Sequence, residues 1–161
     1  PRPCPAGTLA ARVTQHDAGR ILDALAEEVP EGCIACVGFT DEDLFAGKLN
    51  FVFGVGSPTA RVGVYSVFRL GAEPAILRRT LRLMNHEVGH IFGVAHCIFW
   101  SCAMNGSNSL AESDRRPVHW CPLDEDKLLW YFGAERSEWR RRLAAFYRTQ
   151  GMGGDAESLE R

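Results

Sequence analysis

Three histidines and a glutamate, all within eleven consecutive residues, are the groups of this 161-residue sequence that could do chemistry together. His86 and His90 lie four positions apart, so on a helix both imidazoles project from one face, one turn apart. Two imidazoles at this spacing can bind one zinc ion, and Glu87 between them can act as a general base. Gly93 can end the helix, because glycine tolerates the left-handed backbone, and His96 can then return as a third nitrogen ligand. Three protein ligands leave one position for water, which is typical of a catalytic zinc site.

A second group of possible metal ligands follows at once. Cys97 and Cys102 have four residues between them, a workable spacing for zinc ligands. Cys121 is followed three positions later by Asp124, where a zinc knuckle would bring a second cysteine. A carboxylate can bind zinc, His119 and a water are alternative fourth ligands, and the cysteines could instead be small buried apolar residues. We favour a second zinc site in which Asp124 is preferred over His119.

Composition sets broad limits on the partners of the chain. An apolar fraction of 46%, a charged fraction of 24% and a formal net charge of −2 are ordinary for one soluble globular domain and favour neither a nucleic-acid nor a membrane partner. No apolar run has the length of a membrane span, and the first residues lack the apolar segment of a signal peptide. Three cysteines clustered beside a histidine motif favour metal binding in a reducing compartment, so we expect a cytoplasmic protein. We also expect it to be a monomer.

The elements that must position these groups can be read from periodicity and turn residues. A helix predicted over 74–92 has proline in its first turn and an apolar stripe, and it carries His86, Glu87 and His90. Further segments are a helix over 14–29, strands over 33–40, 50–54 and 61–70, and helices over 123–132 and 137–149. Residues 93–120 have no regular period. This order predicts an α+β fold with a small mixed sheet.

The motif from His86 to Cys97, together with Cys102, Met104 and Cys121, resembles the archaemetzincin family of zinc peptidases. The resemblance is strongest over residues 77–124 and includes 106–108 and 114–117. It extends more weakly through 40–44 and 50–54. It implies a metzincin-like α+β fold: a small twisted mixed sheet, an N-terminal helix, a long active-site helix, an irregular Met-turn region and C-terminal helices.

The resemblance also implies roles for individual residues. A catalytic zinc would be held by His86, His90 and His96, with Glu87 as base, and Met104 would support the metal from the tight turn beneath it. A second, structural zinc would be held by Cys97, Cys102, Cys121 and Asp124, the last standing where the family pattern has a cysteine. An edge strand of metzincins pairs with the substrate, and by sequence order that strand would comprise Asn50, Phe51, Val52, Phe53 and Gly54.

We therefore expect one peptidase domain over residues 1–150, a mobile tail over 151–161, two zinc ions and a peptide or protein substrate. Whether such an enzyme would be an aminopeptidase or an endopeptidase stays open. The alternative is an inactive peptidase homologue that serves as a zinc-stabilised peptide-binding module, which the presence of Glu87 disfavours. Cys36 is interpreted as a buried strand residue rather than a metal-binding or redox partner of Cys33, and Cys4 has no assigned role.

Overall fold

The end of the histidine-bearing helix divides the chain into two units. A computed structural model describes residues 3–9 and 14–161, and it separates into Pro1–Gly93 and Val94–Arg161. Each unit is described by itself.

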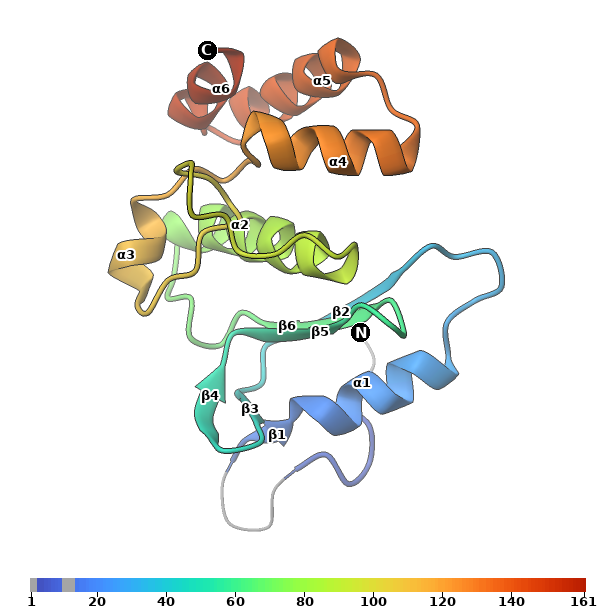
Figure 1. Ribbon diagram of the computed structural model, residues 1–161. Helices are drawn as coiled ribbons and strands as arrows, with labels where there is room; N and C mark the ends of the chain where they lie inside the picture. Colours follow the sequence, from blue (N-terminus) through green and yellow to red (C-terminus); the bar gives the residue numbers. More distant parts are fainter. Residues whose placement is uncertain (1–2, 10–13) are drawn as a thin grey trace. The chain divides into compact units, whose positions relative to one another are not determined.

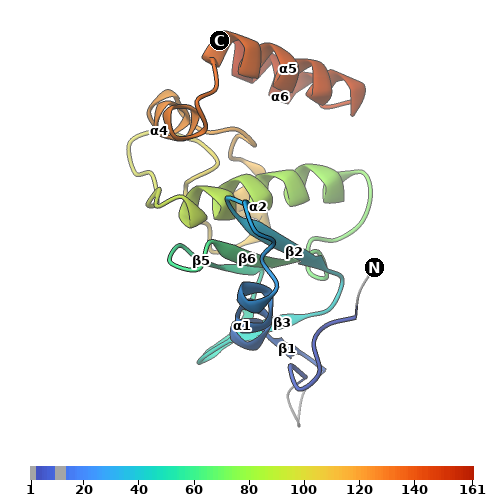
Figure 2. The same ribbon diagram turned by 90° about the vertical axis from the view of Figure 1, so that its right-hand side faces the viewer.

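The first unit is built around a three-stranded mixed sheet with a helix on each face. The sheet has the order β2-β6-β5, in which β6 pairs parallel with β2 and antiparallel with β5. The strands are β2 (Cys36–Thr40), β5 (Gly54–Ser57) and β6 (Val62–Ser66). Helix α1 (Ala18–Glu27) covers one face and helix α2 (Ala75–Ile91) the other, as Figures 1 and 2 show. Every residue of the central strand β6 is buried, as expected for a strand covered on both faces.

A second small sheet extends the first unit. It has the order β1-β3-β4, from β1 (His16–Asp17), β3 (Leu44–Ala46) and β4 (Leu49–Val52). Asp43, directly before β3, accepts two hydrogen bonds from the Arg69 guanidinium, Nε to Oδ1 at 2.7 Å and Nη2 to Oδ2 at 2.6 Å. This hydrogen-bonded ion pair lowers the pKa of Asp43 and fixes the turn that connects the two sheets.

Close packing against Tyr65 explains two glycines of the main sheet. The Tyr65 side chain on β6 is fully buried, and a Cβ at Gly54 or at Gly63 would collide with its ring or its hydroxyl. A Cβ at Gly63 would also lie 2.9 Å from Cδ1 of Ile91 in the last turn of α2. The two glycines thus let the sheet accept a large aromatic side chain between its strands and the end of the histidine-bearing helix.

The second unit is helical after an irregular stretch. Its helices are α3 (Leu110–Asp114), α4 (Pro122–Phe132), α5 (Arg136–Thr149) and α6 (Gly153–Glu160). Helix α4 ends at Gly133, whose φ of 63° is the left-handed conformation of a helix C-terminus. Arg140 of α5 binds the buried Glu125 of α4, with Nη2 to Oε2 at 2.7 Å, and so ties the two helices together.

The structure differs from the predicted elements in four places. Within the segment 151–161, for which no helix was predicted, Gly153–Glu160 form helix α6. Its Ala156 and Leu159 are buried, and its Glu160 pairs with Arg148 at 2.6 Å. The strand predicted over 50–54 is divided between β4 and β5, at Phe53. Helix α1 begins at Ala18, where the Asp17 side chain accepts the Gly19 N–H, rather than near residue 14. The short elements β1, β3 and α3 were not predicted.

The long helices and the remaining strands were predicted correctly to within a few residues. Within residues 3–9 and 14–161, no helix combines the length and apolar character that crossing a bilayer requires.

Candidate metal centres

The last two turns of α2 bring two imidazoles face to edge. The rings of His86 and His90 lie 4.6 Å apart at an interplanar angle of 88°, and their Nε2 atoms are 3.1 Å apart. Two nitrogens on one tetrahedral zinc would be about 3.4 Å apart, given Zn–N bonds of about 2.0–2.1 Å. The pair therefore fits two corners of a zinc site. His86 is 9% exposed, so its ring is shielded from bulk water.

The helix ends where the sequence predicted, and the third histidine follows. Gly93 adopts φ of 80°, and its N–H donates to the His90 carbonyl at 3.0 Å. One ring nitrogen from each of His86, His90 and His96 lies within 4.8 Å of the other two. The three nitrogens form the donor set that sequence spacing predicted for a catalytic zinc ion, with His96 exposed.

Gly106 is a contact of His96 that sequence reasoning missed. A Cβ at Gly106 would lie 3.3 Å from Cε1 and 3.4 Å from Nδ1 of the His96 ring. The backbone of this residue therefore approaches the third imidazole closely, and a side chain here would require a small shift of the ring. The signal available in the sequence was Gly106 itself, two residues after Met104.

Glu87 sits on α2 directly after His86, in an environment that favours a proton. Burial raises the pKa of Glu87 from 4.5 to about 7, because the carboxylate loses hydration. A carboxyl group whose pKa lies near neutrality can both accept and return a proton at physiological pH. This is the property that general acid–base catalysis requires of the residue predicted as base.

A second donor set forms within the second unit. One ligand atom from each of Cys97, Cys102, Cys121 and Asp124 lies within 4.8 Å of the others. Cys121 is the N-cap of α4, and Asp124 stands in the first turn of that helix with its Oδ2 3.3 Å from the Cys121 sulfur. Of the alternatives left open by the sequence, the structure brings Asp124 rather than His119 to the cysteines. Three sulfurs and one oxygen are a donor set that zinc accepts.

The protonation of these cysteines also suits a metal site. Burial raises the pKa of Cys102, and it raises that of Cys121 to about 12. Burial acts in the same direction on Cys97, but hydrogen bonds from the backbone N–H groups of Trp100 and Phe99 outweigh it and lower the pKa. Two thiols therefore hold protons in the absence of metal, which a bound zinc ion displaces because only thiolates ligate it.

Asn105 organises the loop that presents the first two cysteines. Its Oδ1 accepts the Cys102 N–H at 2.8 Å, and its Nδ2 donates to the carbonyls of Cys97 and Trp100, both at 2.7 Å. Met104 beside it is fully buried, and its carbonyl accepts the Cys97 N–H at 3.0 Å. The segment predicted as the Met-turn is thus hydrogen-bonded to the cysteine that follows His96.

The strand predicted to pair with substrate does not lie as a unit beside α2. Asn50, Phe51 and Val52 belong to β4, which is the edge of the smaller sheet, and Phe53 lies between the sheets. Gly54 begins β5, which contacts α2. A Cβ at Gly56 of β5 would lie 3.3 Å from Cγ1 of Ile91 and 3.9 Å from the carbonyl oxygen of Glu87. The edge strand next to the histidine-bearing helix is therefore β5.

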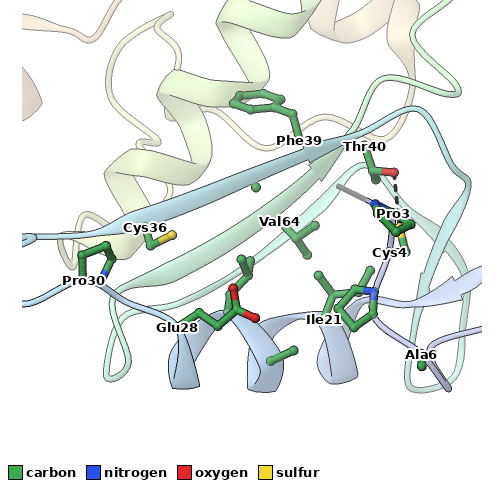
Figure 3. A pocket seen from close by; sticks show the side chains of 14 residues that line it. Pro3, Cys4, Ala6, Ile21, Glu28, Pro30, Cys36, Phe39, Thr40 and Val64 are labelled. Carbon is green, nitrogen blue, oxygen red and sulfur yellow. Dashed lines mark hydrogen bonds between the residues drawn. The ribbon is translucent and has the colours of Figure 1, made fainter. Parts of the chain in front are cut away.

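A pocket of about 630 Å³ lies elsewhere in the first unit, against α1 and β2. Figure 3 shows Cys36 of β2, half-buried, and Glu28, just after α1, on its wall, with Cys4 hydrogen-bonded to Thr40 through Sγ and Oγ1 at 3.5 Å. None of the predicted zinc ligands lines this pocket. Cys33 is exposed and does not line it.

Comparison with known proteins identifies similarity to one peptidase family. The model of Peptidase family M54 matches residues 20–128, a range that includes every residue of both donor sets. Archaemetzincin-2 of Macaca fascicularis is 35% identical over an alignment of 148 positions, and the match covers 71% of this chain and 41% of that protein. The chain thus spans about two fifths of the length of this relative.

Two crystal structures of archaemetzincins share the fold. That from Methanopyrus kandleri has a TM-score of 0.69 and 35% identity, covering 77% of this chain and 72% of the other. That from Archaeoglobus fulgidus, complexed with malonate, has a TM-score of 0.67 and 31% identity, covering 77% and 76%. The α+β fold expected from the sequence is therefore confirmed.

Proposed function

The chain belongs to peptidase family M54, the archaemetzincins, and from this premise we propose that it hydrolyses peptide bonds at a zinc ion held by His86, His90 and His96. The observation that carries the proposal is the convergence of three imidazole nitrogens within 4.8 Å. The same helix places a largely desolvated carboxyl group, Glu87, directly after the first of them. A purely structural zinc site needs no such base.

In this proposal Glu87 moves the protons of the reaction. Zinc, when bound, supplies a Lewis acid that polarises the substrate carbonyl and lowers the pKa of water. The Glu87 carboxylate orients the attacking water and accepts its proton as oxygen bonds to the carbonyl carbon. The carboxylic acid then gives that proton to the amine nitrogen as the C–N bond breaks, which regenerates the carboxylate.

We assign substrate binding to the edge of β5 that does not face β6. Among the described residues, no further strand pairs with that edge, so its backbone groups are open to an extended peptide. Of the residues 50–54 that the sequence analysis expected to bind substrate, only Gly54 belongs to β5.

Two supporting roles complete the proposal. Met104 provides apolar support in its turn, since a thioether is a poor zinc ligand beside imidazole. Cys97, Cys102, Cys121 and Asp124 hold a second, structural zinc ion, which stiffens the segment after His96 because Cys97 is its neighbour. The donor atoms that lie within 4.8 Å of one another support this assignment.

The experiment that tests the activity is digestion of a peptide library by the zinc-loaded chain and by Glu87→Ala, with products identified by mass spectrometry. We expect the variant to keep its zinc content and fold and to lose at least ~100-fold in rate, the lower range for removal of a general base. Glu27→Ala, which removes an exposed carboxylate of α1, should cleave as the unsubstituted chain does.

The library also separates the competing interpretations. Full cleavage by zinc-loaded Glu87→Ala would overturn the assigned base. Peptide binding without cleavage by the zinc-loaded, unsubstituted chain would overturn the enzyme assignment and favour a peptide-binding module. Products shortened from the N-terminus would identify an aminopeptidase, and internal cuts an endopeptidase.

A further inference from the structure

The carboxylate of Asp124 is shared between the cysteine cluster and a lysine one turn along α4. Its Oδ2 lies 3.3 Å from the sulfur of Cys121 and 4.0 Å from that of Cys102. Its Oδ1 accepts a hydrogen bond from Nζ of Lys127 at 2.9 Å. The aspartate is 4% exposed, so both oxygens depend on these partners rather than on bulk water.

The different partners of the two oxygens matter because a carboxylate, unlike a thiolate, has two atoms that can bind a metal and can rotate to present either one. Asp124 can turn either oxygen, or both, toward the three sulfurs. The Lys127 ammonium occupies one oxygen and points the other into the cluster. Residues 124 and 127 are three apart on one helix, the spacing at which their side chains meet.

The charge of the cysteine site also favours a role for Lys127. Three thiolates and one carboxylate bring four negative charges into a site of which three members are buried, and a zinc dication neutralises two of them. The Lys127 ammonium neutralises one more without entering the donor set.

We propose that Lys127 is a positioning residue of the second zinc site: by holding Oδ1 of Asp124, it leaves Oδ2 as the single oxygen donor that completes the three-cysteine set. The inference rests on the proposed second zinc ion and adds a residue to it. The competing interpretation is an ordinary exposed ion pair between residues three apart, since the Lys127 side chain is 64% exposed. Such a pair would affect helix α4 but not the metal.

A double-mutant cycle separates these interpretations. Lys127→Met keeps the length of the side chain and removes its charge, and Asp124→Cys replaces the two-oxygen donor by one sulfur that needs no orienting. Cobalt(II) is the probe, because thiolate-to-cobalt charge-transfer absorption reports on the cysteine site and not on three histidines. Cobalt affinity is measured by titration, and zinc affinity by displacement of the cobalt.

We expect Lys127→Met to weaken cobalt and zinc binding at the cysteine site at least tenfold and to shift the cobalt absorption. In the Asp124→Cys background the same substitution should change affinity less than twofold. Lys127→Arg should restore most of the affinity, and Lys48→Met, at an exposed lysine of the first unit, should have no effect. If Asp124→Cys does not fold, Asp124→Asn replaces it, because a neutral amide also removes the charged partner of Lys127.

Two results would overturn the proposal: an unchanged affinity in Lys127→Met, or an equal loss in both backgrounds, which would mean a general charge effect. Failure of the second zinc site itself has a different signature. If that site does not form, the unsubstituted chain shows no thiolate-to-cobalt charge-transfer absorption, or Cys102→Ser leaves the absorption unchanged. If the site forms, Cys102→Ser abolishes the absorption whatever residue stands at position 127.

Discussion

At Glu87, burial and a bound metal ion would shift the pKa of the carboxyl group in opposite directions. Burial favours the neutral acid and raises its pKa to about 7, whereas a dication held by His86 and His90 would favour the carboxylate. A bound dication would therefore offset part of the cost of desolvating this carboxylate. In the proposed mechanism, Glu87 would then be deprotonated mainly in the zinc-loaded site.

The desolvated carboxylate should make the zinc-free protein less stable as pH rises. The pKa of Glu87 is about 7 in the folded chain and 4.5 in the unfolded chain. Burial of this group therefore does not lower the free energy of unfolding below pH 4.5, and it lowers it progressively more from pH 4.5 to pH 7. The full cost is about 3 kcal/mol, at about 1.4 kcal/mol per pKa unit.

Urea unfolding in the presence of a chelator measures this cost. The difference in unfolding free energy between Glu87→Gln and the unsubstituted chain should grow from under ~1 kcal/mol at pH 5 to about 3 kcal/mol above pH 8. A difference that stays constant with pH would show that the Glu87 pKa is not raised.

At the scale of elements, the long periodic helix α2 could be predicted from the sequence more accurately than the short strands and the C-terminal helix. The apolar stripe of α2 and the glycine after it determine where the helix lies and ends, because a 17-residue helix repeats its pattern over several turns. Strands β1 and β3 have two and three residues, too few to show any period, and β4 and β5 were merged because Phe53 lies between them in one apolar run. Glycines at positions 153 and 154 suggested a tail, but burial of Ala156 and Leu159 outweighs their low helix propensity.

The loop between Cys97 and Asn105 depends on contacts that no pattern reveals. The donor types at the metal sites could be predicted from spacing, but the Asn105 hydrogen bonds, the Gly106 contact with His96 and the Lys127 bond to Asp124 arise from loop geometry. The sequence shows only which residue types stand at these positions, and residue type alone does not predict these contacts.

Asn105→Asp tests the loop. The substitution keeps the shape of the side chain but sets a carboxylate oxygen against the carbonyls of Cys97 and Trp100 in place of two donated hydrogen bonds. We expect the unfolding free energy of the zinc-loaded chain to fall by about 1–3 kcal/mol, the range for a buried polar group left unsatisfied, together with weaker zinc binding at the cysteines. Asn50→Asp, at an exposed asparagine of β4, is the control. A loss equal to that of the control would mean that the two hydrogen bonds donated by Asn105 do not stabilise the loop.

At the scale of the whole molecule, the first unit contains His86, His90 and the desolvated carboxyl group of Glu87, and the second contains the cysteine cluster. His96 and Cys97 are consecutive, so the third catalytic ligand and the first structural ligand share one peptide bond. The proposed function therefore requires two zinc ions with different tasks, and each should be removable without the other.

The zinc content of the intact chain, counted by native mass spectrometry, tests this requirement most directly. Two zinc ions are expected per unsubstituted chain, and one in His90→Ala and in Cys102→Ser, with the cobalt charge-transfer absorption lost only in Cys102→Ser. Two ions retained in His90→Ala, or one ion in the unsubstituted chain that Cys102→Ser leaves in place, would contradict the two-site arrangement.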